Sequence, residues 1–525
     1  MTRLLTFSGT IADLKYSSEG VLALLAIENA RKEVGATEAG AEVAGDLDAA
    51  APEQRIATLS DGTLHWASPA NLFVYEYDWR TAGAGFVGTA APGDGDNNWW
   101  IAKLYAFEPS GEARVLYQPA DLRQQLADPT VSPDGKTVAF IAGIMSDFSS
   151  TGGDVYTMAL DTGAAINVTP SLRASGTSLA WSCRGKLRAA LLAGDQQQVV
   201  ELAAGRSPTT PHVLWSGTET LHGKDAGASW ACPSETLAAA YETYTQPPEI
   251  RVGHLGQWRD LTHANAGMSA PFEARTLTWS NEGVDAQGWL LLPLHVNGKI
   301  PMVTVVHGGP AGASRPSFSG PGLRTALIQR GWAVFYPNPR GSFGQGERFT
   351  AANIRDFGYG DLRDDLAGID SAERAAPIDE GRLGVTGGSY GGYMTMWAVT
   401  QTNRFKAAVA SAGMSDMLSY YGENGIDGWL LPYFGASVYD DPAVYARSSP
   451  ITYIKNVRTP TFAYVGERDI ECPAPQTQEF WHALKTLGVP TAIMIYPGEG
   501  HGLRDPKNSQ DALDRTLAWF DKYLK

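Results

Sequence analysis

The sequence predicts an all-β propeller over residues 1–270, followed by an α/β domain over residues 271–525. A turn motif that recurs at a nearly constant spacing indicates the propeller. Short apolar runs that alternate with amphipathic stretches indicate the α/β domain. The chain length of 525 residues also exceeds the usual size of one hydrophobic core.

The N-terminal part repeats a turn that resembles Ser-Pro-Asp-Gly between short apolar runs. Five copies are marked by Ser18, Ser68, Ser132, Ser182 and Ala231, with spacings of 50, 64, 50 and 49 residues. Four-stranded propeller blades repeat at roughly 40–50 residues. We interpret the longest interval as holding an inserted glycine-rich loop at residues 83–96. The pattern favours a propeller over the alternative, an irregular β-sandwich.

The C-terminal part carries seven apolar runs that predict strands. They lie at residues 288–292, 302–306, 332–336, 382–386, 407–411, 462–465 and 492–496. Helical spacing of apolar residues predicts helices, among them 361–372, 476–487 and 510–524. Strands that alternate with helices are typical of a mostly parallel sheet with flanking helices.

Composition and charge exclude several classes of protein. The net charge of −15 gives an acidic surface that repels phosphate, so we expect no nucleic-acid partner. The sequence contains no apolar stretch of membrane-spanning length and no signal-peptide core, so we expect no membrane association and a cytoplasmic location. The three cysteines, Cys183, Cys232 and Cys472, are too few and odd in number to suggest a disulfide framework. The oligomeric state stays open, a homo-oligomer included.

Residues 387–392, Gly-Gly-Ser-Tyr-Gly-Gly, fit the Gly-x-Ser-x-Gly pattern of a nucleophile elbow. They follow a predicted strand and precede an apolar helical stretch, which is the context that such an elbow requires. The serine of an elbow sits at a strained turn, and we expect the four surrounding glycines to prevent collisions with the crossing backbone. Ser389 is therefore the candidate nucleophile. The alternative is a glycine-rich turn with an idle serine.

A serine hydroxyl needs a base to take its proton, and the base needs an acid to fix its tautomer. His501 follows the last predicted strand, and Asp469 follows the one before it. The order Ser389, Asp469, His501 is that of α/β-hydrolases. Glu467 and Glu471 are rival acids, and a surface histidine in a flexible loop is the alternative interpretation of His501.

The segment His307-Gly308-Gly309-Pro310 follows the predicted strand 302–306. Its bare glycine turn can direct the backbone N–H of Gly309 at an oxyanion, and the N–H of Tyr390 supplies the second donor. His307 is a rival base, for which we expect a structural role. No cluster of Cys and His ligands suggests a metal, so we expect neither a metal nor an organic cofactor.

These motifs resemble those of the prolyl oligopeptidase family of serine peptidases, in particular its acylaminoacyl peptidase and dipeptidyl peptidase-like branches. The matching stretches lie at residues 287–293, 307–310, 338–342, 387–394, 449–451 and 500–502. The resemblance implies an α/β-hydrolase domain with a triad of Ser389, Asp469 and His501. It also implies a propeller that gates access and a substrate that is a short peptide or an acyl-amide.

The chain departs from this family in two places. At about 45 residues per blade, residues 1–270 predict about six blades, which is short for the seven-bladed family. The N-terminal helix that often packs on the hydrolase domain is also not recognisable, so the chain is either naturally compact or lacks a first segment.

The second departure is Glu471, where many relatives carry an Arg or Asn that grips a substrate carbonyl. A carboxylate cannot donate a hydrogen bond to a carbonyl, but it attracts an ammonium group. Our hypothesis is that Glu471 holds a substrate amine, either a free N-terminus or a basic side chain. The alternative is that it points to solvent or pairs with Arg468.

Three functions are compatible with these residues. The best supported is a serine peptidase that hydrolyses short peptides, of aminoacyl, dipeptidyl or acylaminoacyl type, through an acyl-enzyme. An esterase or small-molecule amidase would use the same triad. A non-catalytic propeller scaffold beside an inactive hydrolase domain is the most remote alternative.

Overall fold

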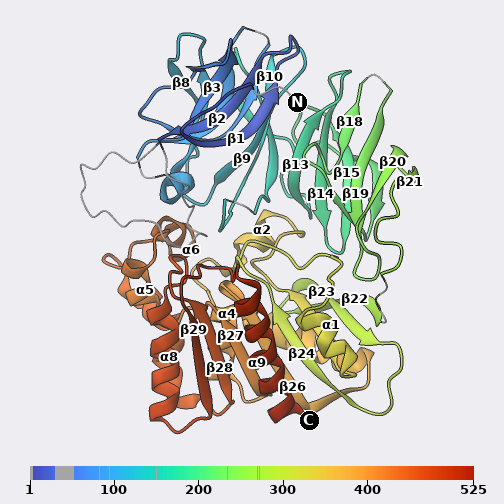
Figure 1. The fold of residues 1–525 in the computed structure, drawn as a ribbon, viewed down its shortest axis with the longest axis vertical. Helices are drawn as coiled ribbons and strands as arrows, with labels where there is room; N and C mark the ends of the chain where they lie inside the picture. Colours follow the sequence, from blue (N-terminus) through green and yellow to red (C-terminus); the bar gives the residue numbers. More distant parts are fainter. Residues whose placement is uncertain are drawn as a thin grey trace.

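The computed structural model describes residues 4–29, 53–81, 83–93, 95–148, 150–161, 163–232, 234–268, 270 and 272–525. Figure 1 shows two parts along the long axis of the molecule, with β-sheets in the N-terminal part and a helix-flanked sheet in the C-terminal part.

The N-terminal part is built from five antiparallel sheets arranged like the blades of a propeller. The first two contain β1 (Gly9–Tyr16), β2 (Leu22–Glu28), β3 (Arg55–Ser60), β4 (Thr63–Trp66), β5 (Phe73–Trp79), β6 (Phe86–Ala91), β7 (Lys103–Phe107) and β8 (Ala113–Tyr117). The third and fourth contain β9 (Gln125–Val131), β10 (Thr137–Gly143), β11 (Asp154–Ala159), β12 (Ala165–Asn167), β13 (Ser175–Trp181), β14 (Leu187–Ala193), β15 (Gln196–Leu202) and β16 (His212–Gly217). The fifth contains β17 (Thr220–His222), β18 (Ser229–Ala231), β19 (Thr236–Glu242), β20 (Glu249–His254) and β21 (Gln257–Asp260).

The propeller prediction is confirmed, but the expected number of about six blades is wrong, because the described residues hold five blades. Dividing residues 1–270 by about 45 residues per blade gave too many blades, because the repeats are longer than 45 residues.

One turn of the repeat was also misplaced. Ser68 lies between β4 and β5, whereas the first hairpin of the second blade turns between Arg80 and Gly85. The predicted inserted loop at residues 83–96 is wrong in part, since residues 86–91 form β6. The extra length instead lies between β2 and β3.

Carboxylates on the first strands join neighbouring blades. Glu76 of the second blade accepts a hydrogen bond from the backbone N–H of Asp128 in the third at 2.9 Å, and Asp128 accepts one from Leu179 in the fourth. Lys224 of the fifth blade pairs with Asp13 of the first. The last sheet therefore meets the first.

Cys183 and Cys232 form a disulfide, although three cysteines in a chain of this length argued against a disulfide framework. They occupy the same turn in consecutive blades, and their Cα atoms lie 6.0 Å apart. The sequence separation of 49 residues equals one repeat, which is why two distant cysteines meet.

The C-terminal part is an eight-stranded sheet in the order β22-β23-β25-β24-β26-β27-β28-β29. Its strands are β22 (Phe272–Asn281), β23 (Val284–Pro293), β24 (Ile300–Val306), β25 (Ala333–Asn338), β26 (Ile378–Gly388), β27 (Phe405–Ser411), β28 (Thr461–Gly466) and β29 (Thr491–Tyr496). From β25 to β29 neighbouring strands are parallel, whereas β22 and β23 are antiparallel additions. All seven predicted strands are confirmed. The sequence analysis missed β22, which lies at the edge of the sheet and has five exposed residues among its ten.

Helices cover both faces of this sheet, as predicted. They are α1 (Leu323–Gln329), α2 (Glu347–Thr350), α3 (Gly360–Ala375), α4 (Tyr390–Gln401), α5 (Met417–Glu423), α6 (Leu430–Phe434), α7 (Pro442–Arg447), α8 (Ala474–Thr486) and α9 (Pro506–Leu524). Side chains of α1 and α9 share one core with one face of the sheet, and those of α3, α4 and α8 share another core with the opposite face. In the part of the chain that the structure describes, no helix combines the length and apolarity needed to cross a membrane.

The disulfide gives a direct prediction. Thiol titration of the unfolded, air-oxidised chain without reductant should find one reactive thiol, that of Cys472, because the other two cysteines are paired. Titration after reduction is the control and should find all three cysteines. Three reactive thiols before reduction would contradict the pairing.

Candidate active site

Ser389 occupies a sharp turn between β26 and α4, as predicted for a nucleophile elbow. Its backbone angles are φ 59° and ψ −124°, a region that L-residues rarely adopt. Hydrogen bonds hold the turn: Ser389 N–H donates to Ser411 O at 3.1 Å, and Tyr393 N–H donates to Ser389 O at 2.9 Å. The strained backbone therefore directs the side chain out of the sheet at the C-terminal ends of the parallel strands.

Three of the four glycines around Ser389 are required by close backbone contacts. A Cβ atom on Gly391 would lie 2.2 Å from Val306 O, and one on Gly392 would lie 2.2 Å from Ser411 O. A Cβ on Gly387 would lie 2.5 Å from Val306 O. Gly388 differs, since its nearest neighbour would be 3.9 Å away, an ordinary contact. The expectation that all four glycines prevent collisions is therefore wrong for Gly388.

Asp469 and His501 lie in the loops after β28 and β29 and are hydrogen-bonded to each other. The distance from Asp469 Oδ2 to His501 Nδ1 is 2.9 Å. Asp469 Oδ1 accepts the backbone N–H groups of Glu471 and Cys472 at 2.9 and 2.8 Å, which fixes the carboxylate. The rival Glu467 instead accepts the N–H of Gly498 at 2.8 Å. The geometry thus favours Asp469 as the partner of the imidazole at Nδ1.

Glu471 lies at the other ring nitrogen of His501. Its Oε2 is 3.4 Å from His501 Nε2, and the residue is only 7% exposed. The alternative that Glu471 points to solvent is therefore wrong. Burial opposes a charge on His501, but the hydrogen bond and charge of Asp469, together with the charges of Glu471 and Asp147, outweigh it and raise the pKa of His501 to about 9. These acidic neighbours thus favour the protonated form of the resting imidazole.

Cys472 is a neighbour of the nucleophile that the sequence analysis missed. Burial raises the pKa of its thiol well above the usual value, and the charges of Asp469 and Glu471 raise it further. A hydrogen bond with the Ser389 side chain acts in the opposite direction. The thiol therefore stays protonated beside the Ser389 hydroxyl. Its position three residues after Asp469 is the only indication that the sequence offers.

The glycine turn after β24 passes directly beside the nucleophile. A Cβ atom on Gly308 would lie 3.6 Å from Ser389 Cβ, and Gly309 has a φ of 127°, which favours glycine. Tyr390 begins α4 immediately after the serine, and its hydroxyl donates to the buried Asp361 Oδ2 at 2.7 Å. The assignment of Gly309 and Tyr390 N–H groups as oxyanion donors remains a prediction.

His307 is engaged within the same turn. Its Nδ1 lies 2.7 Å from Gly308 O, and its Nε2 lies 2.9 Å from Ser342 Oγ. A carbonyl oxygen only accepts, so Nδ1 carries the proton and Nε2 accepts from the serine. Burial lowers the pKa of His307. These contacts agree with a structural role for the ring rather than the role of a base.

A buried ion pair between Arg340 and Asp364 lies near the site. Arg340 donates to Asp364 from Nε and Nη2, both at 2.8 Å, and from its backbone N–H at 2.9 Å. Asp364 lies on α3, one turn from the Asp361 that holds Tyr390. Residues 338–342, Asn-Pro-Arg-Gly-Ser, were noted in the sequence only as a family match. Through Arg340 they connect the loop after β25 to α3.

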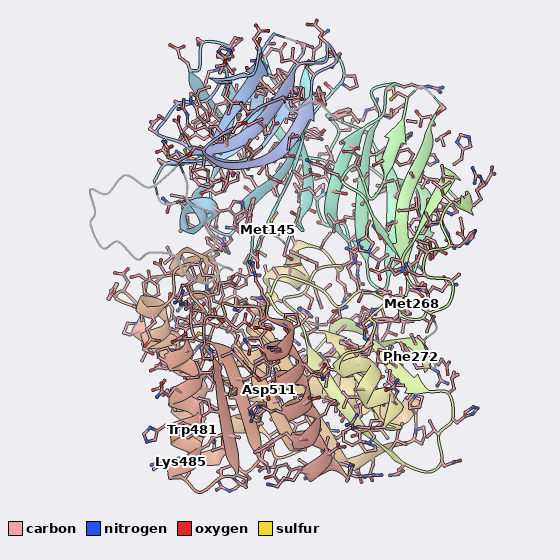
Figure 2. The ribbon with its side chains drawn as sticks, viewed as in Figure 1. Met145, Met268, Phe272, Trp481, Lys485 and Asp511 are labelled. Carbon is pink, nitrogen blue, oxygen red and sulfur yellow. A yellow bond between two sulfur atoms is a disulfide. The ribbon has the colours of Figure 1, made fainter. Side chains whose placement is uncertain are left out.

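The propeller contributes directly to the site through the loop after β10. Ser146 Oγ accepts the backbone N–H of Ala311 at 3.1 Å, two residues after Gly309. The adjacent Asp147 is one of the charges that raise the pKa of His501. Glu347 of α2 accepts the N–H of Ile144 at 3.1 Å. Figure 2 shows the neighbouring Met145 at the lower end of the propeller, facing the helical part.

The fold and these contacts define the C-terminal part as an α/β-hydrolase domain with the residues of a serine hydrolase. Residues 317–525 match the model of the prolyl oligopeptidase family.

Comparison with individual proteins gives matches along more of the chain. An uncharacterized peptidase of Bacillus subtilis (strain 168), YuxL, is 36% identical over 296 residues, covering 53% of this chain and 44% of that protein. Dipeptidyl-peptidase 5 of Porphyromonas gingivalis is 25% identical over 419 residues, covering 76% of this chain and 59% of that protein. The chain therefore spans about half the length of these relatives.

Solved structures resemble the whole chain in fold. The acylaminoacyl peptidase of Pyrococcus horikoshii has a TM-score of 0.76 and 23% identity, and the match covers 98% of this chain and 82% of that one. At this identity the likeness concerns the fold alone.

The glycine geometry predicts opposite outcomes for two neighbouring substitutions. Gly391→Ala should lower the free energy of unfolding by about 1–3 kcal/mol or more, because the new methyl group meets the Val306 carbonyl. Gly388→Ala should change it by less than about 1 kcal/mol, because that position has room. Urea unfolding of both variants measures the difference, and equal destabilisation would contradict the packing described here.

Proposed function

We propose that this chain is a serine peptidase that hydrolyses short peptides through an acyl-enzyme on Ser389. The observation that carries the proposal is the 2.9 Å hydrogen bond between Asp469 and His501, beside a strained serine turn. Ser389 attacks the substrate carbonyl while His501 Nε2 takes its proton. His501 then returns the proton to the leaving amine, and water hydrolyses the acyl-enzyme in the same way.

The oxyanion is held in this proposal by the N–H groups of Gly309 and Tyr390. Its support is the position of the glycine turn beside Ser389 and the anchoring of Tyr390 by Asp361. Donors fixed by the fold stabilise developing charge without reorganisation. No step requires a metal or an organic cofactor.

The names of the relatives indicate the class of substrate. Proteins similar to this chain are called acylaminoacyl peptidase and dipeptidyl-peptidase 5. We extend to this chain an action on short peptides of aminoacyl, dipeptidyl or acylaminoacyl type. The propeller acts as a gate in this proposal, because its loop after β10 reaches Ala311 beside the nucleophile. The cytoplasmic location is likewise kept as a prediction.

Glu471 is proposed to bind the free amine of the substrate. In the resting site its carboxylate faces His501 Nε2, the nitrogen that must receive the proton of Ser389. A substrate ammonium that attracts Glu471 would weaken this contact and lower the pKa of His501, which frees Nε2 to act as a base. Substrate binding and base activation would then be coupled through one carboxylate.

The reaction class is tested with a fluorophosphonate probe and a panel of substrates. We expect the probe to label Ser389 and the Ser389→Ala variant to remain unlabelled, because the hydroxyl is the proposed nucleophile. Aminoacyl- and peptidyl-anilides should be hydrolysed beside simple acyl esters. Turnover of esters without any amide hydrolysis would favour the esterase alternative, and no adduct in folded protein would favour the non-catalytic scaffold.

The role of Glu471 is tested by kinetics across pH. In the wild type, kcat/KM should rise with pH through the pKa of His501, about 9, since the base must be neutral. Glu471→Gln removes a charge that raises this pKa, so the rise should move to lower pH. The variant should lose about tenfold or more on free-amine substrates but not on their N-acetylated counterparts.

Glu467→Gln is the matched control, because Glu467 lies in the same loop but bonds to Gly498. It should leave the pH profile in place. Equal losses on both substrate classes in the Glu471 variant, with an unchanged pH profile, would contradict amine recognition.

A further inference from the structure

A cavity of about 350 Å³ lies between the fifth blade and the C-terminal domain, outside the catalytic residues. On the propeller side it is lined by residues of β17 and β19 and by Tyr244. On the other side it is lined by residues 313–317, by Arg324 of α1 and by Tyr336 of β25. Any molecule bound there would therefore contact both parts of the chain.

Two arginines, Arg315 and Arg324, line this cavity. Arg315 donates one hydrogen bond, from Nη2 to Gln197 Oε1 at 3.1 Å. Arg324 is held more firmly, with Nε donating to the Tyr336 hydroxyl at 3.0 Å and its guanidinium 4.8 Å from the ring centre of Tyr244. Arg324 is thus fixed by its neighbours, whereas Arg315 has further N–H groups to offer.

The acidic residues at the cavity, including its lining residue Glu242, are bonded to groups other than Arg315. Glu242 accepts the backbone N–H of Phe318 at 2.6 Å and pairs with His222 at 2.8 Å. Glu219, which lines a smaller adjoining hollow with Arg315, lies 4.0 Å from Arg251. Across the described ranges, no carboxylate forms an ion pair with Arg315, and burial lowers the pKa of Arg315 with no acidic neighbour to oppose it.

A desolvated guanidinium is stabilised by an anion, and carboxylates and phosphates match its planar donors. The protein as a whole carries a charge of −15, so two arginines in one cavity do not reflect a basic surface. The volume falls in the range of about 300–1,000 Å³ typical of small-molecule sites, larger than a single inorganic ion needs.

We propose that this cavity binds the carboxylate or phosphate group of a small organic anion, with Arg315 as the principal contact and Arg324 as a second positive charge. The site goes beyond the proposed peptidase reaction. Arg315 follows Gly309 by six residues, so their Cα atoms are at most about 20 Å apart. The C-terminal carboxylate of a short peptide is therefore one source of the anion, and a free metabolite anion is the other.

Calorimetric titration of the full-length Ser389→Ala protein tests the proposal without turnover. The probes are an N-acetylated tripeptide acid, the same tripeptide as its amide, and inorganic phosphate. We expect the acid to bind about tenfold or more tightly than the amide, the effect of a charged hydrogen bond, and phosphate to compete with it. Phosphate binding without a preference for the acid would also support the site and assign it to a free anion.

Variants of Arg315 decide whether the binding occurs in this cavity. Arg315→Gln should abolish both the preference for the acid and the binding of phosphate, and Arg315→Lys should retain part of both because it keeps the charge. Arg330→Gln is the matched control, since Arg330 is paired with Asp521 on another surface. Failure of both anions to bind, or binding that Arg315→Gln and Arg315→Lys leave unchanged, would overturn the proposal. Fluorophosphonate labelling of Ser389 in the wild type tests the peptidase proposal separately.

Discussion

The Asp469 carboxylate is the interaction on which the site depends. One of its oxygens accepts two backbone N–H groups of its own loop, and the other accepts the ring N–H of His501. Hydrogen bonds to charged groups contribute about 1.5–3 kcal/mol each, so the carboxylate holds its loop and the imidazole together. Because this group connects the loop after β28 to His501 Nδ1 in the loop after β29, it sets the orientation of the base.

The remainder of the fold serves to bring other segments to the same point. The parallel strands β24, β26 and β27 place the glycine turn, Ser389 and the Ser411 carbonyl next to one another. A Cβ atom on Gly391 or Gly392 would lie only 2.2 Å from a backbone carbonyl oxygen, which explains why glycine occupies these positions of the elbow. The propeller adds a loop that contacts Ala311. The site is therefore assembled from both parts of the chain, although its three catalytic candidates lie in one.

Much of this arrangement could be predicted from the sequence, because it is encoded locally. The sequence runs that form β24 to β29 are short and apolar, and the glycines of the elbow lie in one segment. The strands and the nucleophile could therefore be predicted. The edge strand β22 was not, because half-exposed residues on an antiparallel edge carry little hydrophobic pattern. The second blade was misplaced because its hairpin between Arg80 and Gly85 does not resemble the Ser-Pro-Asp-Gly turn of residues 132–135.

Several contacts between distant segments could not be predicted. The pairing of Cys183 with Cys232 depends on how consecutive blades align in space, which the 49-residue spacing of their turns does not establish by itself. Side-chain direction in loops decides three further features: Glu471 lies at His501 Nε2, Cys472 lies at Ser389, and the cavity lies at Arg315.

A structure of the Ser389 phosphonate adduct tests the account most directly. The account predicts His501 Nε2 turned from Glu471 to the adduct oxygen, with its bond to Asp469 intact; a His501 that remains on Glu471, or a serine far from the imidazole, would contradict it.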